Sequence, residues 1–316
     1  MKRVLVVSSG RADGTPLQPV VKHLPEHRRL DLEHRSPDQC VRATAMAIED
    51  YRPDVLLILG DRFESLGAAY AATYAGVPIA HIHGGEITRG AFDDQIRHAI
   101  SKLACLHFVA AEPYGERLRR LGERAVHVVG APGLDNLTGL PEREPANYFV
   151  CTYHPCTNVR EDGIGAILEA LERFPDYRAI WTVVNADPGS EAVREALRGH
   201  DVRKLASARD YHLLCRGAAC VVGNSSSGLI EAPFLCVPSV NIGERQAGRL
   251  SGPSVQHCPT EVADIVRAID AALVYDGPFD SPYGEAGART AASAAGSKNG
   301  GCRIAAGNTT SLKVGL

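Results

Sequence analysis

Short apolar segments alternate with longer amphipathic segments along most of the chain, and this alternation restricts the possible folds more than any other feature. The apolar segments at residues 2–7, 54–59 and 77–81 have the length of strands, and each precedes a segment with helical spacing, the first helix being expected from Pro16. Apolar residues stand at consecutive positions, as in strands buried on both faces. The pattern predicts an α/β fold in which helices cover both faces of parallel sheets.

The alternation is interrupted once, at residues 137–147, where two prolines and three charged residues indicate a linker. It then resumes, with expected strands at residues 148–152, 178–184, 219–222 and 239–242. We therefore predict two doubly wound, Rossmann-like domains, residues 1–140 and 148–284, with a ligand-binding cleft between them. Residues 285–316 are mostly small and polar and lack periodicity, which predicts a disordered or atypical tail.

Composition narrows the class of protein further. The charges nearly balance, with 34 Lys and Arg against 37 Asp and Glu, which weighs against a dedicated nucleic-acid-binding protein. No apolar run approaches the roughly 18 residues of a membrane span, and the run after Arg3 is too short for a signal peptide. The nine cysteines form no Cys-x-x-Cys pair, so we expect reduced thiols, buried as core residues at Cys105, Cys220 and Cys236. These features predict a cytoplasmic protein that binds neither nucleic acid nor membranes.

Two common nucleotide-binding motifs are missing from the sequence. The first expected strand is not followed by Gly-x-Gly-x-x-Gly, the fingerprint of nicotinamide-binding domains, and no P-loop motif occurs anywhere. The sequence therefore predicts neither a nicotinamide cofactor nor a P-loop site.

A serine-rich turn stands between an expected strand and an expected helix, at Gly223-Asn224-Ser225-Ser226-Ser227-Gly228. Amide groups and hydroxyls at a helix N-terminus form an anion site, so Ser225 and Ser226 would bind a phosphate. The alternative is that these serines only cap the helix. Glu231 lies deeper in the same helix and could accept hydrogen bonds from a ribose.

Two arginines follow expected strands in the same way. Arg245 comes after the strand at residues 239–242, and Arg11 comes after the first strand of the chain. Each by itself could be a solvated surface residue. Together, at strand ends that face one cleft, they favour a diphosphate ligand.

Acidic side chains follow the strands of the first half. Asp61 comes directly after the strand at residues 54–59, whereas Glu86 and Asp93 come after the next strand. Carboxylates that converge on one cleft can supply the general base and the general acid of a proton transfer. The sequence therefore predicts acid–base chemistry at this end of the first sheet.

The expected helix at residues 93–103 pairs Asp93 with Arg97 and Asp94 with His98 at a spacing of four, which could be no more than a solvated helix face. A metal site is a competing interpretation, since several side chains are of ligand type: His81, His83, Asp93 and His98. His81 and His83 would point the same way from a strand. The neighbouring cation of Arg97 weighs against a metal ion, so we predict none.

Four segments together resemble one known family. They are Gly60-Asp61-Arg62-Phe63-Glu64, His81-Ile82-His83-Gly84-Gly85-Glu86, Asp93-Asp94-Gln95-Ile96-Arg97-His98-Ala99-Ile100-Ser101-Lys102-Leu103 and Gly223-Asn224-Ser225-Ser226-Ser227-Gly228. Over residues 1–284 the chain is similar to the hydrolysing UDP-N-acetylglucosamine 2-epimerases, which include bacterial enzymes of sialic and legionaminic acid synthesis. The resemblance implies a glycosyltransferase-B type fold. It also implies a reaction that eliminates UDP with loss of the C2 proton, then adds water to release a 2-epimer of the N-acetylmannosamine type.

The resemblance implies a role for each residue that matches a family motif. Acid–base chemistry would fall to Asp61, Asp93 and either His83 or Glu86, since some family members have a catalytic glutamate at the position of His83. The implied substrate contacts are Arg97 on the sugar or diphosphate, His154, Ser225, Ser226 and Arg245 on the diphosphate, Asn185 and Glu231 on the uridine side, and Arg11 and Arg62 from the first domain. No cofactor or metal is implied, and family members are commonly dimers or tetramers.

Three other interpretations stay open. A non-hydrolysing epimerase, another enzyme of the same fold type, and an inactive nucleotide-sugar-binding relative would share part of these motifs. Non-hydrolysing relatives typically carry His-Arg-Arg-Glu where this chain has Thr152-Tyr153-His154-Pro155, which favours the hydrolysing branch. The chain departs from the family in a short segment near residues 30–35 and in its tail, where the family has a C-terminal helix.

Overall fold

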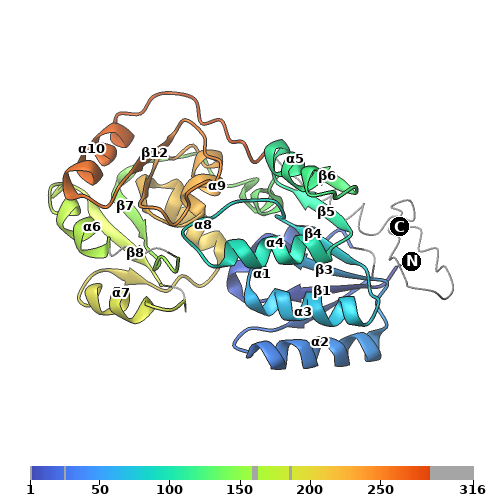
Figure 1. Cartoon of the computed structure of the whole chain (residues 1–316). Coiled ribbons are helices and arrows are strands. Elements are labelled where there is room, and N and C mark those ends of the chain that lie inside the picture. The colour runs from blue at the N-terminus through green and yellow to red at the C-terminus, as the bar shows by residue number, and fades with distance from the viewer. Residues whose placement is uncertain (1, 25, 159–162, 185–186, 285–316) are drawn as a thin grey trace. The chain divides into compact units, whose positions relative to one another are not determined.

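The computed structural model describes residues 2–24, 26–158, 163–184 and 187–284, which form two compact units (Figure 1). Unit 1 contains Met1–Glu86, Asp93–Asn136 and a C-terminal segment that begins at Tyr283, and unit 2 contains Ile87–Phe92 and Leu137–Pro282. The domains expected at residues 1–140 and 148–284 stay a prediction. The expected tail, residues 285–316, lies outside the described residues.

Unit 1 is built on a six-stranded parallel sheet with the strand order β2-β1-β3-β4-β5-β6. Its elements are β1 (Val4–Ser8), α1 (Arg11–Val21), β2 (His27–Asp31), α2 (Pro37–Tyr51), β3 (Val55–Leu59), α3 (Phe63–Tyr74), β4 (Ile79–Ile82), α4 (Asp93–Leu103), β5 (Leu106–Val109), α5 (Glu112–Arg120), β6 (Val126–Val128) and the 3₁₀ helix η1 (Pro132–Leu137). Successive residues of β3 point to opposite faces: Leu57 packs in one core with Leu17 of α1, and Leu56 in another with Ala68 of α3. Helices therefore cover both faces, as predicted.

Unit 2 contains a second six-stranded parallel sheet, with the order β12-β11-β10-β7-β8-β9. Its elements are β7 (Ala146–Thr152), α6 (Ile164–Leu171), β8 (Arg178–Thr182), α7 (Ser190–Ala196), β9 (Val202–Arg203), α8 (Ala208–Arg216), β10 (Ala218–Gly223), α9 (Ser227–Phe234), β11 (Ser239–Ile242), β12 (Val255–Cys258) and α10 (Val262–Leu273). The two sheets confirm the predicted α/β class with two Rossmann-like units. The cleft expected between them stays a prediction.

Each sheet has one point at which the strand order changes direction. In unit 1 the chain passes from β1 to β2 and then crosses to β3 on the other side of β1. In unit 2 it passes from β7 through β8 to β9 and then crosses to β10. Ligands of doubly wound sheets bind beyond the carboxyl ends of the strands at such a switch point. The segments that follow β1 and β3 in unit 1 and β7 and β10 in unit 2, with the neighbouring segments after β4 and β11, are therefore the places to look for a site.

The short segment Ile87–Phe92 lies between two elements of unit 1 in sequence, but it packs within unit 2. The backbone amide of Thr157 donates a hydrogen bond to the carbonyl oxygen of Gly90 at 3.1 Å. A Cβ atom at Gly90 would lie 2.4 Å from the carbonyl oxygen of Glu244, so only glycine fits at this position. Sequence periodicity does not reveal this packing, because it depends on residues far along the chain.

Some element boundaries differ from the predictions. Helix α1 begins at Arg11 and not at Pro16, because the amide of Gly14 already donates to the carbonyl oxygen of Gly10 at 2.9 Å. Pro16 and Pro19 lie inside the helix, although neither has a backbone N–H to donate. Strand β12 and helix α10 were not predicted.

The cysteine predictions hold only in part. Cys220 is a buried free thiol, as predicted, and burial raises its pKa. Cys236 is exposed, with a left-handed φ of 57°, so its prediction as a core residue is wrong. Cys105 is partly buried against the core of unit 1, and its Sγ lies 3.5 Å from the carbonyl oxygen of Ile79.

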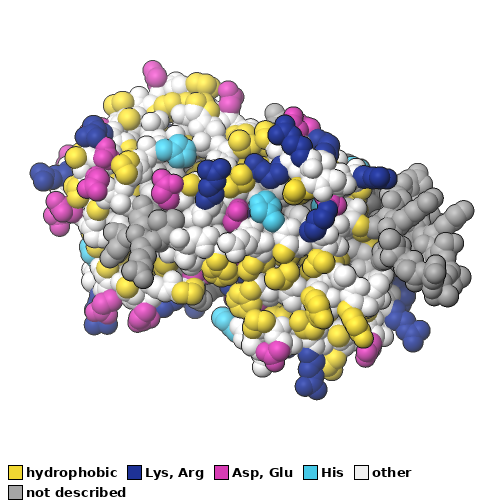
Figure 2. Space-filling model, in the orientation of Figure 1, with side chains coloured by type: hydrophobic (Ala, Val, Ile, Leu, Met, Phe, Trp, Pro, Cys, Tyr) yellow, Lys and Arg dark blue, Asp and Glu magenta, His cyan; other side chains and the backbone are white. Residues whose placement is uncertain are grey.

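The surface of unit 1 carries two distinct patches. Figure 2 shows hydrophobic side chains gathered over α2 and α3, where Met46, Tyr70 and Tyr74 are at least 60% exposed. Basic side chains gather over α5, whose last turn contains three arginines (Figure 2). Within the described part of the chain, no helix combines the length and the apolar character that a membrane span needs.

Candidate functional site

A buried arginine gathers the acidic groups of unit 1. Arg97, on α4, has only 1% of its side chain exposed, and it forms ion pairs with Asp61 and, at 3.4 Å, with Asp94. Its Nη1 also donates a hydrogen bond to the backbone carbonyl oxygen of Glu86 at 3.2 Å. Gly60, with a left-handed φ of 85°, turns the chain between β3 and Asp61. One guanidinium therefore connects α4 with the segments that follow β3 and β4.

His83 and Glu86 form a second pair immediately after β4. The Nδ1 atom of His83 lies 2.5 Å from Oε1 of Glu86; the Glu86 side chain is fully buried, and 13% of the His83 side chain is exposed. Because a carboxylate only accepts hydrogen bonds, Nδ1 carries the proton, and Nε2 of a neutral ring is left as an acceptor. His83 has a left-handed φ of 63°, a costly conformation for a non-glycine residue and one that clusters at functional sites.

His81 has a structural arrangement and not that of a metal ligand. Its Nε2 donates to the carbonyl oxygen of Gly60 at 2.7 Å, and its Nδ1 accepts from the hydroxyl of Ser101 at 3.1 Å. Burial lowers the pKa of His81 to about 3, so the ring is neutral and both nitrogens are occupied. His81 therefore supports the turn that precedes Asp61.

The alternative metal site is corrected by this geometry. Strand β4 ends at Ile82, and His83 follows it with a left-handed backbone conformation. The prediction that His81 and His83 share one face of a strand is therefore wrong. Among the residues that the structure describes, no group of three or more His, Cys, Asp or Glu side chains is arranged to hold a metal ion.

Helix α4 places its acidic residues as follows. Asp94, three residues before Arg97, forms an ion pair with it at 3.4 Å, and it also lies 3.7 Å from Nε2 of His98, the pair that the sequence predicts. Burial lowers the pKa of His98, and the charge of Asp94 opposes this shift. Asp93 opens the helix with a half-buried side chain.

The two other arginines expected from unit 1 stand at helix starts. Arg62 precedes α3, and its Nε donates to Glu64 at 3.2 Å; 25% of the Arg62 side chain is exposed against 4% of Glu64. Glu64 was not predicted as a site residue, although it stands in the same motif. Arg11 begins α1, and its side chain lies outside the description.

In unit 2 a buried asparagine joins the loops that follow β7, β10 and β11. The backbone amide of His154 donates to Oδ1 of Asn224 at 2.8 Å, and Nδ2 of Asn224 donates to the carbonyl oxygen of His154 at 2.7 Å. The carbonyl oxygen of Asn224 accepts from Nη1 of Arg245 at 3.1 Å and from Nε2 of Gln246 at 3.0 Å. Ser225 is the next residue, so three residues predicted to bind the diphosphate lie at one edge of the sheet.

The electrostatics of this edge suit an anion. Burial lowers the pKa of His154 to about 3, and the positive charge of Arg245 adds to the shift, so the imidazole is neutral at physiological pH. The Arg245 side chain is 15% exposed, and its Nη2 lies 4.0 Å from Oδ2 of Asp187. A partly exposed guanidinium beside a helix N-terminus favours a bound phosphate.

The serine-rich turn opens α9 as predicted. Ser226 is the N-cap residue, and Oγ of Ser225 accepts a hydrogen bond from the amide of Ser227 at 3.3 Å, so the capping alternative is realised in part. Glu231 lies within α9 and is half-buried. Asn185 lies outside the described residues.

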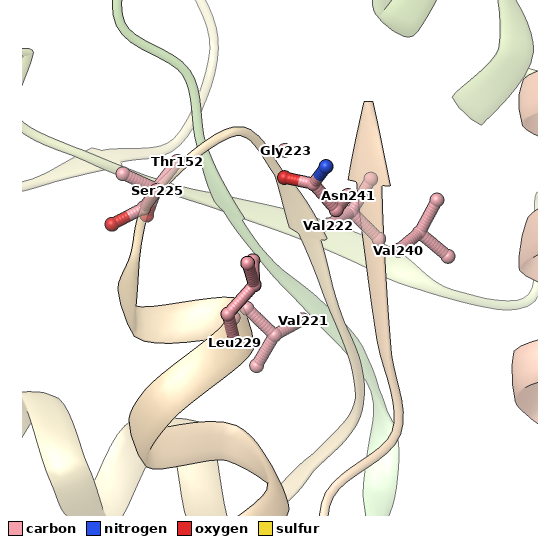
Figure 3. A pocket seen from close by; sticks show the side chains of 9 residues that line it. Thr152, Val221, Val222, Gly223, Ser225, Leu229, Val240 and Asn241 are labelled. Carbon is pink, nitrogen blue, oxygen red and sulfur yellow. The ribbon is translucent and has the colours of Figure 1, made fainter. Parts of the chain in front are cut away.

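A small pocket lies at the switch point of the unit 2 sheet (Figure 3). It is formed by the carboxyl ends of β7, β10 and β11 and the start of α9, and Thr152, Ser225 and Asn241 contribute its polar side chains. Asn241 is 5% exposed, its Nδ2 lies 3.1 Å from Nδ1 of His257, and its Oδ1 has no hydrogen-bond partner among the described residues. Sequence reasoning missed Asn241; the only signal was a polar residue near the end of an apolar strand.

Comparison with known proteins identifies the family. A sequence model described as UDP-N-acetylglucosamine 2-epimerase matches residues 23–293. The chain is 37% identical over 240 residues to the polysialic acid biosynthesis protein P7 of Escherichia coli, covering 69% of this chain and 61% of that protein. It is 34% identical over 249 residues to the GDP/UDP-N,N'-diacetylbacillosamine 2-epimerase (hydrolyzing) of Campylobacter jejuni, covering 71% and 64%. The matched region thus spans less than two thirds of the length of these two relatives.

Solved structures of low sequence identity share the fold. The UDP-GlcNAc 2-epimerase of Methanocaldococcus jannaschii, in complex with UDP-GlcNAc and UDP, superposes with a TM-score of 0.79 at 16% identity, covering 93% of this chain and 98% of that chain. The UDP-GlcNAc 2-epimerase of Neisseria meningitidis, bound to UDP-GlcNAc, gives 0.77 at 17% identity with the same coverage. The two Rossmann-like units are therefore of the glycosyltransferase-B type. By fold and by sequence over most of its length, this chain belongs to the UDP-N-acetylglucosamine 2-epimerase family.

Proposed function

We propose that this protein is a hydrolysing epimerase, which converts UDP-N-acetylglucosamine or a related UDP-di-N-acetyl sugar to UDP and the free 2-epimer. The observation that carries the proposal is the pairing of Arg97 with Asp61 and with the loop that holds the His83–Glu86 pair. The name of the C. jejuni relative, a hydrolyzing 2-epimerase, supports this branch over the non-hydrolysing one.

The reaction requires proton transfer on both faces of the sugar. Loss of the C2 proton and cleavage of the C1–O bond release UDP and leave a glycal. Addition of water then places a hydroxyl on C1 and a proton on the opposite face of C2, which gives the epimer. Two separate acid–base groups are needed, and the candidates of unit 1 are Asp61, Asp93 and the His83–Glu86 pair.

Within that pair, we assign the proton transfer to His83. The Glu86 side chain is fully buried and holds Nδ1 of His83 at 2.5 Å, whereas the His83 side chain is partly exposed. A carboxylate that binds one imidazole nitrogen fixes the tautomer and makes the other nitrogen a stronger base. In this proposal Glu86 takes the orienting role.

Arg97 would hold Asp61 in place by their ion pair, since a buried guanidinium leaves the carboxylate little freedom. It could also steady the sugar or the departing diphosphate. A fixed positive charge near the leaving group can assist bond cleavage without a metal ion.

Unit 2 would bind the UDP portion. The start of α9 with Ser225 and Ser226, together with Arg245 and His154, forms an edge suited to the diphosphate. On the same proposal Glu231 and Asn185 serve the uridine, and Arg11 and Arg62 are further substrate contacts.

The proposal is tested by incubating the protein with UDP-N-acetylglucosamine and, in parallel, with UDP-N,N'-diacetylbacillosamine. Chromatography measures free UDP, and NMR in D₂O identifies the sugar. Release of UDP with a 2-epimer deuterated at C2 is the expected result. Intact UDP-sugar epimerised at C2 would instead indicate a non-hydrolysing enzyme, and binding without product an inactive relative. Activity should survive EDTA, because the proposed groups need no metal.

The two substrates are both included because the relatives differ in their names. The C. jejuni relative is named for diacetylbacillosamine and the E. coli relative for polysialic acid biosynthesis. A product of the N-acetylmannosamine type would serve the synthesis of a sialic-acid-like sugar, and the faster substrate identifies which one.

We also propose that the protein is a cytoplasmic homo-oligomer, a dimer or a tetramer. The exposed apolar side chains of Met46, Tyr70 and Tyr74 on α2 and α3 are compatible with a subunit interface. Light scattering after size exclusion would measure the mass, and a monomer at micromolar concentration would contradict the oligomer.

A further inference from the structure

We infer that Asn224 is the positioning residue of the diphosphate site: it holds the His154 loop and the Arg245 side chain in register with the serines of α9. The inference rests on the proposed function, because it assigns this edge of unit 2 to the diphosphate. Asn224 is fully buried, so its role is to support the groups that touch the ligand and not to touch it.

The first part of the support is a reciprocal pair of hydrogen bonds with His154. The amide of His154 donates to Oδ1 at 2.8 Å, and Nδ2 donates to the His154 carbonyl oxygen at 2.7 Å. A carboxamide presents an acceptor and a donor side by side in this way, whereas an ionised carboxylate presents only acceptors. The pair fixes the loop after β7 although the two residues are 70 positions apart.

The second part acts on the loop after β11. The carbonyl oxygen of Asn224 accepts from Nη1 of Arg245 at 3.1 Å and from Nε2 of Gln246 at 3.0 Å. A bond to a guanidinium is stronger than a neutral one, and it sets the direction of the planar group. Asp187, 4.0 Å from Nη2, lies on the other branch of the same guanidinium.

The third part is the backbone of Asn224 itself. Its amide donates to the carbonyl oxygen of Thr152, the last residue of β7, at 3.0 Å. The carboxamide, the amide and the carbonyl of one residue thus connect the ends of three strands. Replacement by alanine would leave the amide and carbonyl of the half-buried His154 without these partners.

The test uses two substitutions and measures UDP affinity by calorimetry at pH 8.0 and pH 5.5. Asn224→Ala should weaken binding by about 10- to 100-fold at both pH values, the usual effect of losing hydrogen bonds that orient a charged group. Asn224→Asp should bind UDP as weakly as Asn224→Ala at pH 8.0, because its carboxylate would face the carbonyl oxygen of His154 and two acceptors cannot form a hydrogen bond. At pH 5.5 a buried carboxyl is protonated, regains a donor, and should bring the affinity to within about threefold of wild type.

The groups that surround Asn224 do not produce this recovery by themselves. His154 is neutral over the whole range, because burial lowers its pKa to about 3, and Arg245 stays charged. Asp187, 4.0 Å from Arg245, is present in the wild type and in the variants alike. The protonation of UDP changes wild type and variant alike, so each affinity is expressed relative to wild type at the same pH. Asn136→Asp is the matched control, since its Nδ2 also donates to a backbone carbonyl, that of Thr15 in unit 1.

The outcomes separate the inference from the function on which it rests. The positioning role is supported if the UDP affinity of Asn224→Asp, relative to wild type, rises at pH 5.5 and that of Asn136→Asp does not. A variant that is only destabilised is not expected to show this rise. A flat relative affinity, or wild-type binding by Asn224→Ala, overturns it while the proposed function stands. Failure of the wild-type protein to bind UDP overturns both.

Discussion

The two sheets differ in the kind of group that is held together at the carboxyl ends of their strands, which we call the edge of each unit. In unit 1, the contacts are ion pairs and a histidine–carboxylate pair, made by Asp61, Arg97, His83 and Glu86. In unit 2, the central residue is the neutral Asn224, whose partners are backbone groups, an amide and a single guanidinium.

The difference corresponds to the two tasks of the proposed reaction. Proton transfer requires groups that change charge, and such groups must be held by other charges when they are buried. Binding a diphosphate requires donors and positive charge in fixed directions, which amides and an arginine supply without titrating. Substitutions at the first edge should therefore affect turnover, and those at the second edge should affect binding.

The largest expected effect is that of Asp61→Asn. The substitution keeps the size of the side chain but removes its proton-transfer capacity, so kcat should fall by about 10³-fold or more, while UDP affinity changes by less than about threefold. Steady-state kinetics and calorimetry measure the two quantities, with the exposed Asp50→Asn as control. A collapse of UDP affinity would show that Asp61 does not belong to the turnover side of the comparison.

The His83–Glu86 pair sharpens the comparison within unit 1. If His83 transfers the proton and Glu86 only orients it, His83→Ala should lower kcat by about 10²- to 10³-fold and Glu86→Gln by a smaller factor. The measurement is kcat at saturating substrate for both variants. The reverse order would identify Glu86 as the base.

Arg245→Ala examines the binding edge. Loss of a charged hydrogen bond donor should weaken UDP binding by about 10- to 100-fold and change kcat much less. Arg267→Ala, which removes an exposed arginine of the same unit, is the control and should leave the affinity unchanged. Unchanged UDP affinity in Arg245→Ala would remove this residue from the phosphate site.

The last expected effect is on stability in acid, and it should appear in both units. Burial lowers the pKa of His81 in unit 1 and of His154 in unit 2 to about 3, so the folded protein cannot take up protons that the unfolded chain binds below about pH 6.5. The stabilisation from a neutral buried histidine is complete above that pH and is lost as the pH falls, by about 1.4 kcal/mol per pH unit for each group.

His81→Gln isolates one of these contributions. The variant lacks the titrating group, so its free energy of unfolding should fall less steeply between pH 6.5 and 5.0 than that of the wild-type protein. Urea unfolding at several pH values measures the slope. Equal slopes would mean that His81 takes up its proton in the folded protein.

Local sequence patterns predicted most of the fold and named most of the residues at both edges. Strand β11 and helix α4 have the predicted bounds, because apolar periodicity and helical spacing are properties of neighbouring residues. The prediction failed where the signal was local but weak, as at Pro16, which stands inside a helix that begins earlier. Roles that depend on a partner elsewhere in the chain were also missed, as for Asn224 and Asn241.

The order of strands and helices, and the placement of Asp61, Glu86 and Ser225 after strands, follow from the sequence patterns. Which of these groups meet depends on the folded chain: Arg97 meets Asp61, 36 residues away, and Asn224 meets His154, 70 residues away. His81 meets the Gly60 turn and not a metal ion. The physical reason is that hydrophobic patterning acts between neighbours in the chain. Ion pairs and hydrogen bonds between distant residues depend on strand register, turn geometry and burial, which exist only in the folded protein.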